Sequence, residues 1–249
     1  TDMSNASRIL DLKYKLMTIE LLNLAKNYYT YRELSQMIGL PETVLSRYVK
    51  GHVLPTIERA EAMNNVLQRI LRLDDELRKR IQLDDYGYFD NTKIIGDTLF
   101  LERAVQYAVD KFAGKRITKV LTAAVDGIPL STLLAHRLGV KLVIAKKERE
   151  VGVREFLEEM YILPGSGVTV SLYVPRGIIR KNDSILIVDD VIDSGEAQSA
   201  LIKIVERARG EVTGIFALIS IGDGWKRLAE QGQYQVEAVL NIQPKGRGT

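Results

Sequence analysis

Residues 185–197 read ILIVDDVIDSGEA, and this stretch decides the fold of the larger part of the chain. Its first four residues are apolar and predict a buried strand, and the residues that follow the turn, as far as Arg209, are typical of a helix. Backbone N–H groups in such a turn and at the helix start favour a bound phosphate, and the carboxylates of Asp189 and Asp190 can accept hydrogen bonds from sugar hydroxyls. The stretch therefore predicts a site for a sugar phosphate.

The alternative interpretation is a solvated strand end in which Asp193 or Ser194 only caps the helix. It is disfavoured because two carboxylates directly after four buried apolar residues are costly without a ligand. Two other phosphate-binding motifs are missing. No Gly-Lys-Ser or Gly-Lys-Thr follows the strand, and no Gly-x-Gly-x-x-Gly turn is present.

The chain divides into a helical part and a part in which strands and helices alternate. Further short apolar runs lie at residues 119–124, 141–145, 168–174 and 212–219. Their alternation with helical stretches predicts an α/β domain with a mostly parallel central sheet over residues 94–249. Apolar residues at helical spacing predict an all-α helix-turn-helix domain over residues 1–75. Residues 76–93 are predicted to be the linker.

Residues 31–50 fit a pair of helices joined by a tight turn. Gly39 permits the turn, and Pro41 opens the second helix where its missing N–H costs nothing. The side chains predicted to face inward are Leu34, Ile38, Leu40, Leu45 and Tyr48. The side chains predicted to point outward are Glu42, Thr43, Ser46, Arg47 and Lys50. The last four of these are the candidates for contacts with DNA.

Together with the continuation through Gly51 and Leu54-Pro55 into another helix, this unit resembles the helix-turn-helix of the Cro and CI repressor type. The resemblance implies that residues 42–50 enter the major groove of DNA and that two copies bind as a symmetric homodimer. The alternative is a purely structural helical bundle, because short helix pairs with a glycine turn also occur there.

Composition excludes several classes of protein. The 249 residues contain no cysteine and only two histidines, so disulfides and the usual zinc or iron ligands are missing, and any metal would be oxygen-bound. The stretch from Thr1 to Leu12 lacks the apolar core of a secretory signal, and no stretch is long and apolar enough for a membrane span. We therefore expect a cytoplasmic protein that does not bind membranes. The net charge of +3 is compatible with nucleic-acid binding but does not establish it.

Residues 92–242, which contain the opening stretch, resemble the type I phosphoribosyltransferases, whose signature binds 5-phosphoribosyl 1-pyrophosphate (PRPP). Residues 125–129 resemble the pyrophosphate loop of that family, and Lys146-Lys147-Glu148 resembles its basic residues. By this resemblance Asp189 and Asp190 would hold the ribose hydroxyls. The residues that would surround the 5-phosphate are Asp193, Ser194, Gly195, Glu196 and Ala197. Those that would face the pyrophosphate are Asp126, Gly127, Lys146 and Lys147.

The resemblance also suggests how the rest of the site is arranged. Residues 148–167 take the place of the mobile hood loop, and Trp225 would form the base-side wall unless it packs in the core. No cofactor is expected to bind tightly, although Mg²⁺ would accompany PRPP. The family turn carries hydroxyls on both sides of its glycine, whereas here Glu196 adds a carboxylate and Ala197 lacks a hydroxyl. Binding should survive in weakened form, and we assign no catalytic residue.

These features favour a transcriptional regulator that senses PRPP, or a related ribose phosphate or nucleotide, and controls genes of nucleotide or sugar metabolism. In this arrangement of domains the chain resembles archaeal orotate phosphoribosyltransferase-like regulators. It also resembles the bacterial purine repressor, which joins a DNA-binding domain to an inactive PRPP-binding domain. Two alternatives remain: an active phosphoribosyltransferase for a purine or orotate, and an allosteric subunit whose helical domain docks a protein.

Overall fold

The computed structural model describes residues 2–81, 90–232 and 234–243. The chain forms two compact units, Thr1–Glu76 and Leu77–Thr249. Helix α5 (Leu73–Arg80) crosses the predicted boundary at residue 75, so the predicted linker 76–93 begins as a helix. It also ends in one, α6 (Thr92–Ile95), while residues 82–89 lie outside the described part. The sequence did not predict helix α5 because it has few apolar residues. Its acidic residues lie in the first turn and its basic residues in the last, which suits the helix dipole and stabilises the helix.

The first unit is all helical, as predicted. Its helices are α1 (Asp2–Ala25), α2 (Tyr31–Ile38), α3 (Glu42–Val49) and α4 (Ile57–Ile70). Side chains from all four meet in one core, among them the fully buried Leu22, Leu34, Leu45, Met63 and Leu67. The unit therefore has a hydrophobic core of its own.

Local hydrogen bonds fix where α2 begins and ends. The Thr30 hydroxyl accepts from the Glu33 backbone N–H at 3.2 Å, and the Glu33 carboxylate accepts from the Thr30 N–H at 2.7 Å. This reciprocal capping box satisfies two N–H groups that the helix itself leaves unpaired. Gly39 then ends α2 with a φ of 78°, a left-handed conformation that favours glycine, and so makes the predicted turn.

The second unit is an α/β domain. Its helices are α6, α7 (Thr98–Lys111), α8 (Ile128–Leu138), α9 (Glu196–Arg207) and α10 (Gly224–Gly232). Its strands are β1 (Lys119–Ala123), β2 (Lys141–Ala145), β3 (Phe156–Ile162), β4 (Thr169–Pro175), β5 (Ser184–Ile192), β6 (Glu211–Ile221) and β7 (Gln235–Ile242).

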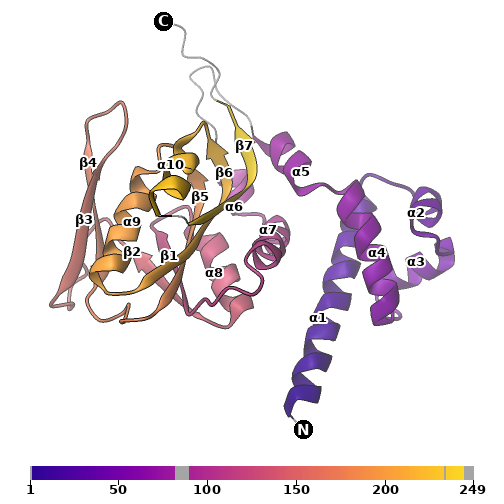
Figure 1. Ribbon diagram of the computed structural model, residues 1–249. Helices are drawn as coiled ribbons and strands as arrows, with labels where there is room; N and C mark the ends of the chain where they lie inside the picture. The colour runs from indigo at the N-terminus through magenta and orange to yellow at the C-terminus, as the bar shows by residue number, and fades with distance from the viewer. Residues whose placement is uncertain (1, 82–89, 233, 244–249) are drawn as a thin grey trace, which may run out of the picture. The chain divides into compact units, whose positions relative to one another are not determined.

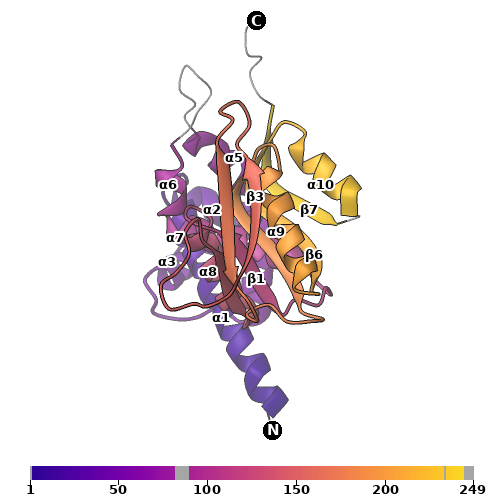
Figure 2. The same cartoon turned by 90° about the vertical axis from the view of Figure 1, so that its left-hand side faces the viewer.

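Five of these strands form the central sheet, in the order β2-β1-β5-β6-β7, and every neighbouring pair is parallel. Helices α7 and α8 lie on one side of this sheet and α9 on the other, as Figure 1 and Figure 2 show. Strands β3 and β4 form a separate antiparallel hairpin that stands beside α9. The predicted parallel sheet is confirmed, and β5, which carries the acidic pair, is its middle strand.

Three strands differ from the sequence-based expectations. Residues 148–167, expected as a hood loop, contain β3, which pairs with β4 from Phe156 opposite Pro175 to Ile162 opposite Thr169. Strand β4 was expected as part of the parallel sheet but lies in this antiparallel hairpin. Strand β7 lies at an edge of the sheet and was not expected at all. No helix in the described part of the chain is long and apolar enough to cross a membrane.

Candidate functional site

The acidic pair lies near the carboxyl end of the middle strand. Asp189 and Asp190 are only 8% and 9% exposed, although both carry carboxylates. Ligands of parallel α/β sheets bind outside the carboxyl ends of the strands, and β5 delivers the pair to that edge. Two carboxylates buried side by side are costly without a compensating partner, which is why they mark a candidate site.

The carboxylate of Asp189 points inward and is held by the protein itself. It accepts a hydrogen bond from the Gln198 side-chain amide at 2.7 Å and one from the backbone N–H of Asp190 at 2.9 Å. Burial, followed by the nearby charge of Asp190, raises the pKa of Asp189 well above its ordinary value. The Asp189 carboxylate is therefore bonded within β5 and α9, whereas the Asp190 carboxylate is bonded to another segment of the chain.

The partner of Asp190 comes from a segment that sequence analysis treated as linker. The side-chain amide of Asn91 donates to Asp190 at 2.6 Å and to Asp126 at 3.3 Å. Asn91 thus joins the strand-end carboxylate to the loop that follows β1. The sequence-based assignment did not include Asn91. Its position 99 residues before Asp190 gave no local signal.

The loop after β1 packs directly on the acidic pair. At Gly127 an added Cβ would lie 2.5 Å from the Thr122 hydroxyl oxygen and 2.9 Å from the Asp189 carboxylate. Both distances are shorter than side-chain atoms tolerate, so glycine is required for this close approach. Asp126, beside it, is exposed. The structure brings Asp126 and Gly127 next to Asp189 and Asp190, as the resemblance implied.

The lysines after β2 reach the same edge of the sheet because β2 runs parallel to β1 and β5. Lys146 and Lys147 are both exposed, and the Lys146 ammonium pairs with the Glu150 carboxylate at 2.8 Å. The backbone of Lys146 also bonds to the backbone of Tyr173 in β4, at 3.0 Å and 2.8 Å. The base of the hairpin is therefore fastened beside the lysine pair.

The turn between β5 and α9 is shaped by glycine. Gly195 has a φ of 82° and precedes the first residue of α9, so the start of α9 lies at the end of the central strand. Asp193 is exposed, while Ser194, Glu196 and Ala197 are half-buried. An added Cβ at Gly224 would collide with the backbone of Asp193 and Ser194, so the start of α10 lies against this turn.

Arg227 of α10 forms an ion pair with Glu196, the residue that departs from the family pattern. Its guanidinium donates to the Glu196 carboxylate at 2.7 Å and to the Ser194 carbonyl at 2.6 Å. The negative charge of Glu196 is therefore compensated by a cation fixed to the same turn. The ion pair reduces the repulsion that Glu196 would exert on a bound phosphate.

Trp225 is half-buried and packs against the core of the sheet domain. Its indole N–H is buried and has no hydrogen-bond partner among the described residues. The contact with the core matches the structural alternative, while its role as a base-side wall stays a prediction.

The helix-turn-helix presents the face that was predicted from sequence. Leu34, Leu45 and Tyr48 are buried, and Ile38 and Leu40 are half-buried in the same cluster. Thr43, Arg47 and Lys50 are exposed along α3, and Ser46 is half-buried. The Arg59 guanidinium in α4 donates to the Tyr48 hydroxyl at 3.2 Å and so fastens α3 to the next helix.

Comparison with known proteins agrees with both units. Residues 99–234, more than half of the chain, match the phosphoribosyl transferase domain family. The chain belongs to the phosphoribosyltransferase family. Residues 20–70 match a helix-turn-helix family, so a DNA-binding type of domain precedes the phosphoribosyltransferase domain in this member of the family.

Relatives of the phosphoribosyltransferase domain are enzymes by name. Xanthine phosphoribosyltransferase of Bacillus cereus is 30% identical over 157 residues, which cover 61% of this chain and 79% of that protein. The enzyme of the same name from Lactococcus lactis is 31% identical over 169 residues, 63% of this chain and 84% of that protein. Adenine phosphoribosyltransferase from Rhodothermus marinus has a similar structure, with a TM-score of 0.61 and 29% identity, covering 69% of this chain and 99% of that one.

Proposed function

We propose that this protein is a DNA-binding transcriptional regulator whose phosphoribosyltransferase domain senses PRPP or a related ribose phosphate. The proposal depends on one observation: a single chain joins a helix-turn-helix with an exposed Thr43–Lys50 face to a buried acidic pair beside a phosphate-type turn. DNA binding and ligand binding in one chain give a direct route from metabolite level to transcription, in genes of nucleotide or sugar metabolism.

In this proposal the ligand lies outside the carboxyl end of β5. Asp190 accepts hydrogen bonds from the ribose hydroxyls. The backbone N–H groups of the turn at Gly195 and of the first residues of α9 bind the 5-phosphate. The loop at Gly127 and the lysines after β2 face the pyrophosphate. Nucleotides and other ribose phosphates share the sugar-phosphate part, so they would occupy the same position.

Oxygen ligands for Mg²⁺ are present where the pyrophosphate would lie. Asp126 and Asp190 meet on one amide of Asn91, so their carboxylates lie close together. Mg²⁺ commonly uses one or two carboxylates and completes its shell with substrate phosphates and water. No group of three or more acidic or histidine side chains able to hold a metal occurs among the described residues, so the ion would arrive with PRPP. It would neutralise the pyrophosphate charge.

Two features of the turn favour a sensor over an enzyme. Ala197 offers no hydroxyl to the phosphate, and a lost hydroxyl bond costs about 1 kcal/mol. Glu196 adds a negative charge that Arg227 has to compensate. A site that binds reversibly tolerates both changes, whereas catalysis needs stronger binding in the transition state than in the ground state.

The regulator would act as a homodimer that binds two DNA half-sites. PRPP can change DNA affinity only by binding two arrangements of the dimer with different affinity. DNA must then change PRPP affinity by the same factor.

A mobility-shift assay tests this proposal. Duplexes selected from a random library at low salt are bound by the full chain, with and without PRPP and Mg²⁺. DNA binding should change with PRPP, and the PRPP effect should disappear in Asp190→Asn while DNA binding persists. An Arg47→Ala and Lys50→Ala double variant should lose DNA affinity and reduce the slope of affinity against salt by about two. Absence of DNA binding at low salt would reject the proposal and favour a protein-docking role for the helical unit.

The second candidate is an active purine phosphoribosyltransferase, which is favoured by the similarity to xanthine and adenine enzymes. It predicts pyrophosphate release from PRPP in the presence of xanthine, hypoxanthine, guanine, adenine or orotate. Release with any of these bases, absent in Asp190→Asn, would establish the enzyme. No release with the whole panel, together with PRPP binding, would leave the sensor.

A further inference from the structure

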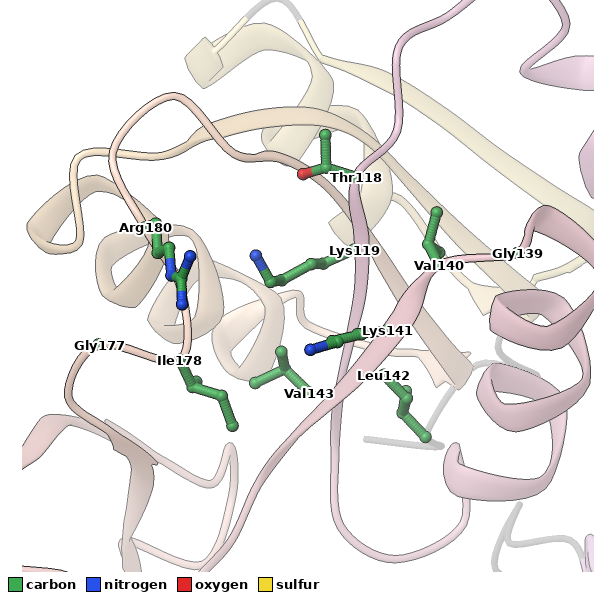
Figure 3. Close-up of a pocket in the computed structure, with 10 residues that line it drawn as sticks. All are labelled: Thr118, Lys119, Gly139, Val140, Lys141, Leu142, Val143, Gly177, Ile178 and Arg180. Atoms are coloured by element: carbon green, nitrogen blue, oxygen red, sulfur yellow. The ribbon is translucent and has the colours of Figure 1, made fainter.

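A second pocket lies at the opposite edge of the central sheet. Lys119 and Lys141 are the first residues of β1 and β2, whereas the acidic pair lies near the end of β5. Because these strands are parallel, their starts share one edge and their ends the other. The pocket has a volume of about 570 Å³ and is also lined by Val140, Leu142, Ile178 and Arg180 (Figure 3). It is therefore distinct from the PRPP-type site.

Three cationic side chains point into this pocket. Figure 3 shows the ammonium groups of Lys119 and Lys141 and the guanidinium of Arg180 directed toward the same space. Lys119 and Lys141 are also direct register partners on neighbouring strands. Like charges opposite each other in a sheet destabilise it, so this arrangement costs free energy unless an anion compensates it.

The carboxylate of Asp183 lies beside these cations and already accepts several hydrogen bonds from the protein. Asp183 accepts hydrogen bonds from the Lys119 ammonium, from the Thr118 hydroxyl at 2.9 Å and from the Arg180 backbone N–H at 2.7 Å. Burial raises the pKa of Asp183, but the bonds from Lys119, Arg180 and Thr118 outweigh burial and lower it below its ordinary value. Asp183 is thus a fixed anion that compensates Lys119.

The other two cations have no such partner. Within the described part of the chain, neither the Lys141 ammonium nor the Arg180 guanidinium forms an ion pair. Both residues line the pocket and are exposed. Beside them Ile178 is 42% exposed, and Val140 and Leu142 are half-buried, so the cations have an apolar wall next to them.

We propose that this pocket is a second binding site, for a small organic phosphate with an apolar or aromatic part, such as a nucleoside monophosphate. Lys141 and Arg180 bind the phosphate, and Val140, Leu142 and Ile178 contact the remainder of the ligand. Ligand sites of this kind commonly have volumes of roughly 300–1,000 Å³, and they combine apolar walls with a few well-placed polar groups. Since the acidic pair lies at the other edge of the sheet, such a ligand would not compete directly with PRPP. It would act as an effector of the protein.

The test uses the full chain with Asp190→Asn, which removes the main contact for ribose at the first site. Calorimetry with AMP, GMP, CMP, UMP and inorganic phosphate should find at least one nucleotide that binds, more tightly than inorganic phosphate does. Adding Lys141→Gln and Arg180→Gln should lower that affinity about tenfold or more, because charge-assisted bonds to the phosphate are lost. The matched control is Lys203→Gln, which removes an exposed lysine of α9 and should leave the affinity unchanged.

Two results would overturn the proposal. They are no binding of any compound of the panel, and binding that survives the loss of Lys141 and Arg180. Both substituted side chains are exposed, and Lys141→Gln removes the charge that faces Lys119, so the variants should unfold at or above the wild-type temperature. A thermal unfolding curve verifies that they are folded.

Discussion

Replacing Gly127 with alanine should damage both stability and PRPP binding. The new Cβ would lie 2.5 Å from the Thr122 hydroxyl oxygen and 2.9 Å from the Asp189 carboxylate. Neither neighbour can move easily, because Thr122 is fully buried and the Gln198 amide holds Asp189 at 2.7 Å. The backbone of the loop must therefore shift. Overpacking of this kind costs about 1–3 kcal/mol.

The shift also displaces the groups that would face the pyrophosphate. Loss of one charge-assisted hydrogen bond, about 1.5–3 kcal/mol, corresponds to a loss of roughly tenfold to 150-fold in PRPP affinity. The assays are urea unfolding and calorimetric titration with PRPP and Mg²⁺. Adding Thr122→Ala removes the shorter of the two contacts, so it should restore part of the stability.

The control for this prediction is Val168→Ala, outside this loop. Val168 is 53% exposed, so this variant should unfold within about 0.5 kcal/mol of the wild type and bind PRPP normally. Wild-type stability and PRPP affinity in Gly127→Ala would refute the argument that the loop packs on the acidic pair.

Three further predictions follow from the contacts described above. The pKa of Asp189 is raised in the folded chain, so the folded state binds the extra proton and stability should fall as pH rises from the unfolded pKa through the folded one. Urea unfolding of wild type and Asp189→Asn across about pH 4 to 8 should show that stability falls further with rising pH in the wild type than in the variant. Arg227→Gln should weaken PRPP binding several-fold, because the charge of Glu196 is then no longer compensated, and should change stability by less than about 1 kcal/mol. Adding Glu196→Gln should restore the PRPP affinity. An affinity unchanged by Arg227→Gln would contradict this prediction. Thr30→Ala should destabilise the helical unit by about 1 kcal/mol in thermal unfolding, whereas Thr30→Ser should not.

The sequence predicted those parts of the structure that depend on local patterns. Apolar runs located five of the strands, and the order of acidic pair, glycine turn and helix located the turn at Gly195. In the helical unit, spacing alone separated the buried Leu34 and Leu45 from the exposed Arg47.

The missed strands lack a clear local pattern. In β3 only Leu157 is buried, because the hairpin is two-stranded and largely exposed, and Glu158 and Glu159 interrupt its apolar run. Strand β7 lies at an edge of the sheet and is mostly half-buried. Tertiary packing therefore decides both strands more than propensity does.

The missed site features depend on contacts between distant segments. Asn91 reaches Asp190 across 99 residues, and the pairing of Lys119 with Lys141 depends on the register of two strands. Arg227 compensates Glu196 because α10 packs on the turn, which no spacing in the sequence indicates. These residues belong to sites because of their positions in the fold, which their residue types alone do not predict.

Calorimetric titration of the full chain with PRPP and Mg²⁺ tests the central claim most directly, namely that the end of β5 and the turn that follows it bind a ribose phosphate. The wild type should bind one PRPP per chain, and Asp190→Asn, which keeps the size of the side chain, should bind at least about tenfold more weakly through loss of a charged hydrogen-bond partner. No heat of binding in the wild type, or equal affinity in Asp190→Asn, would contradict the account.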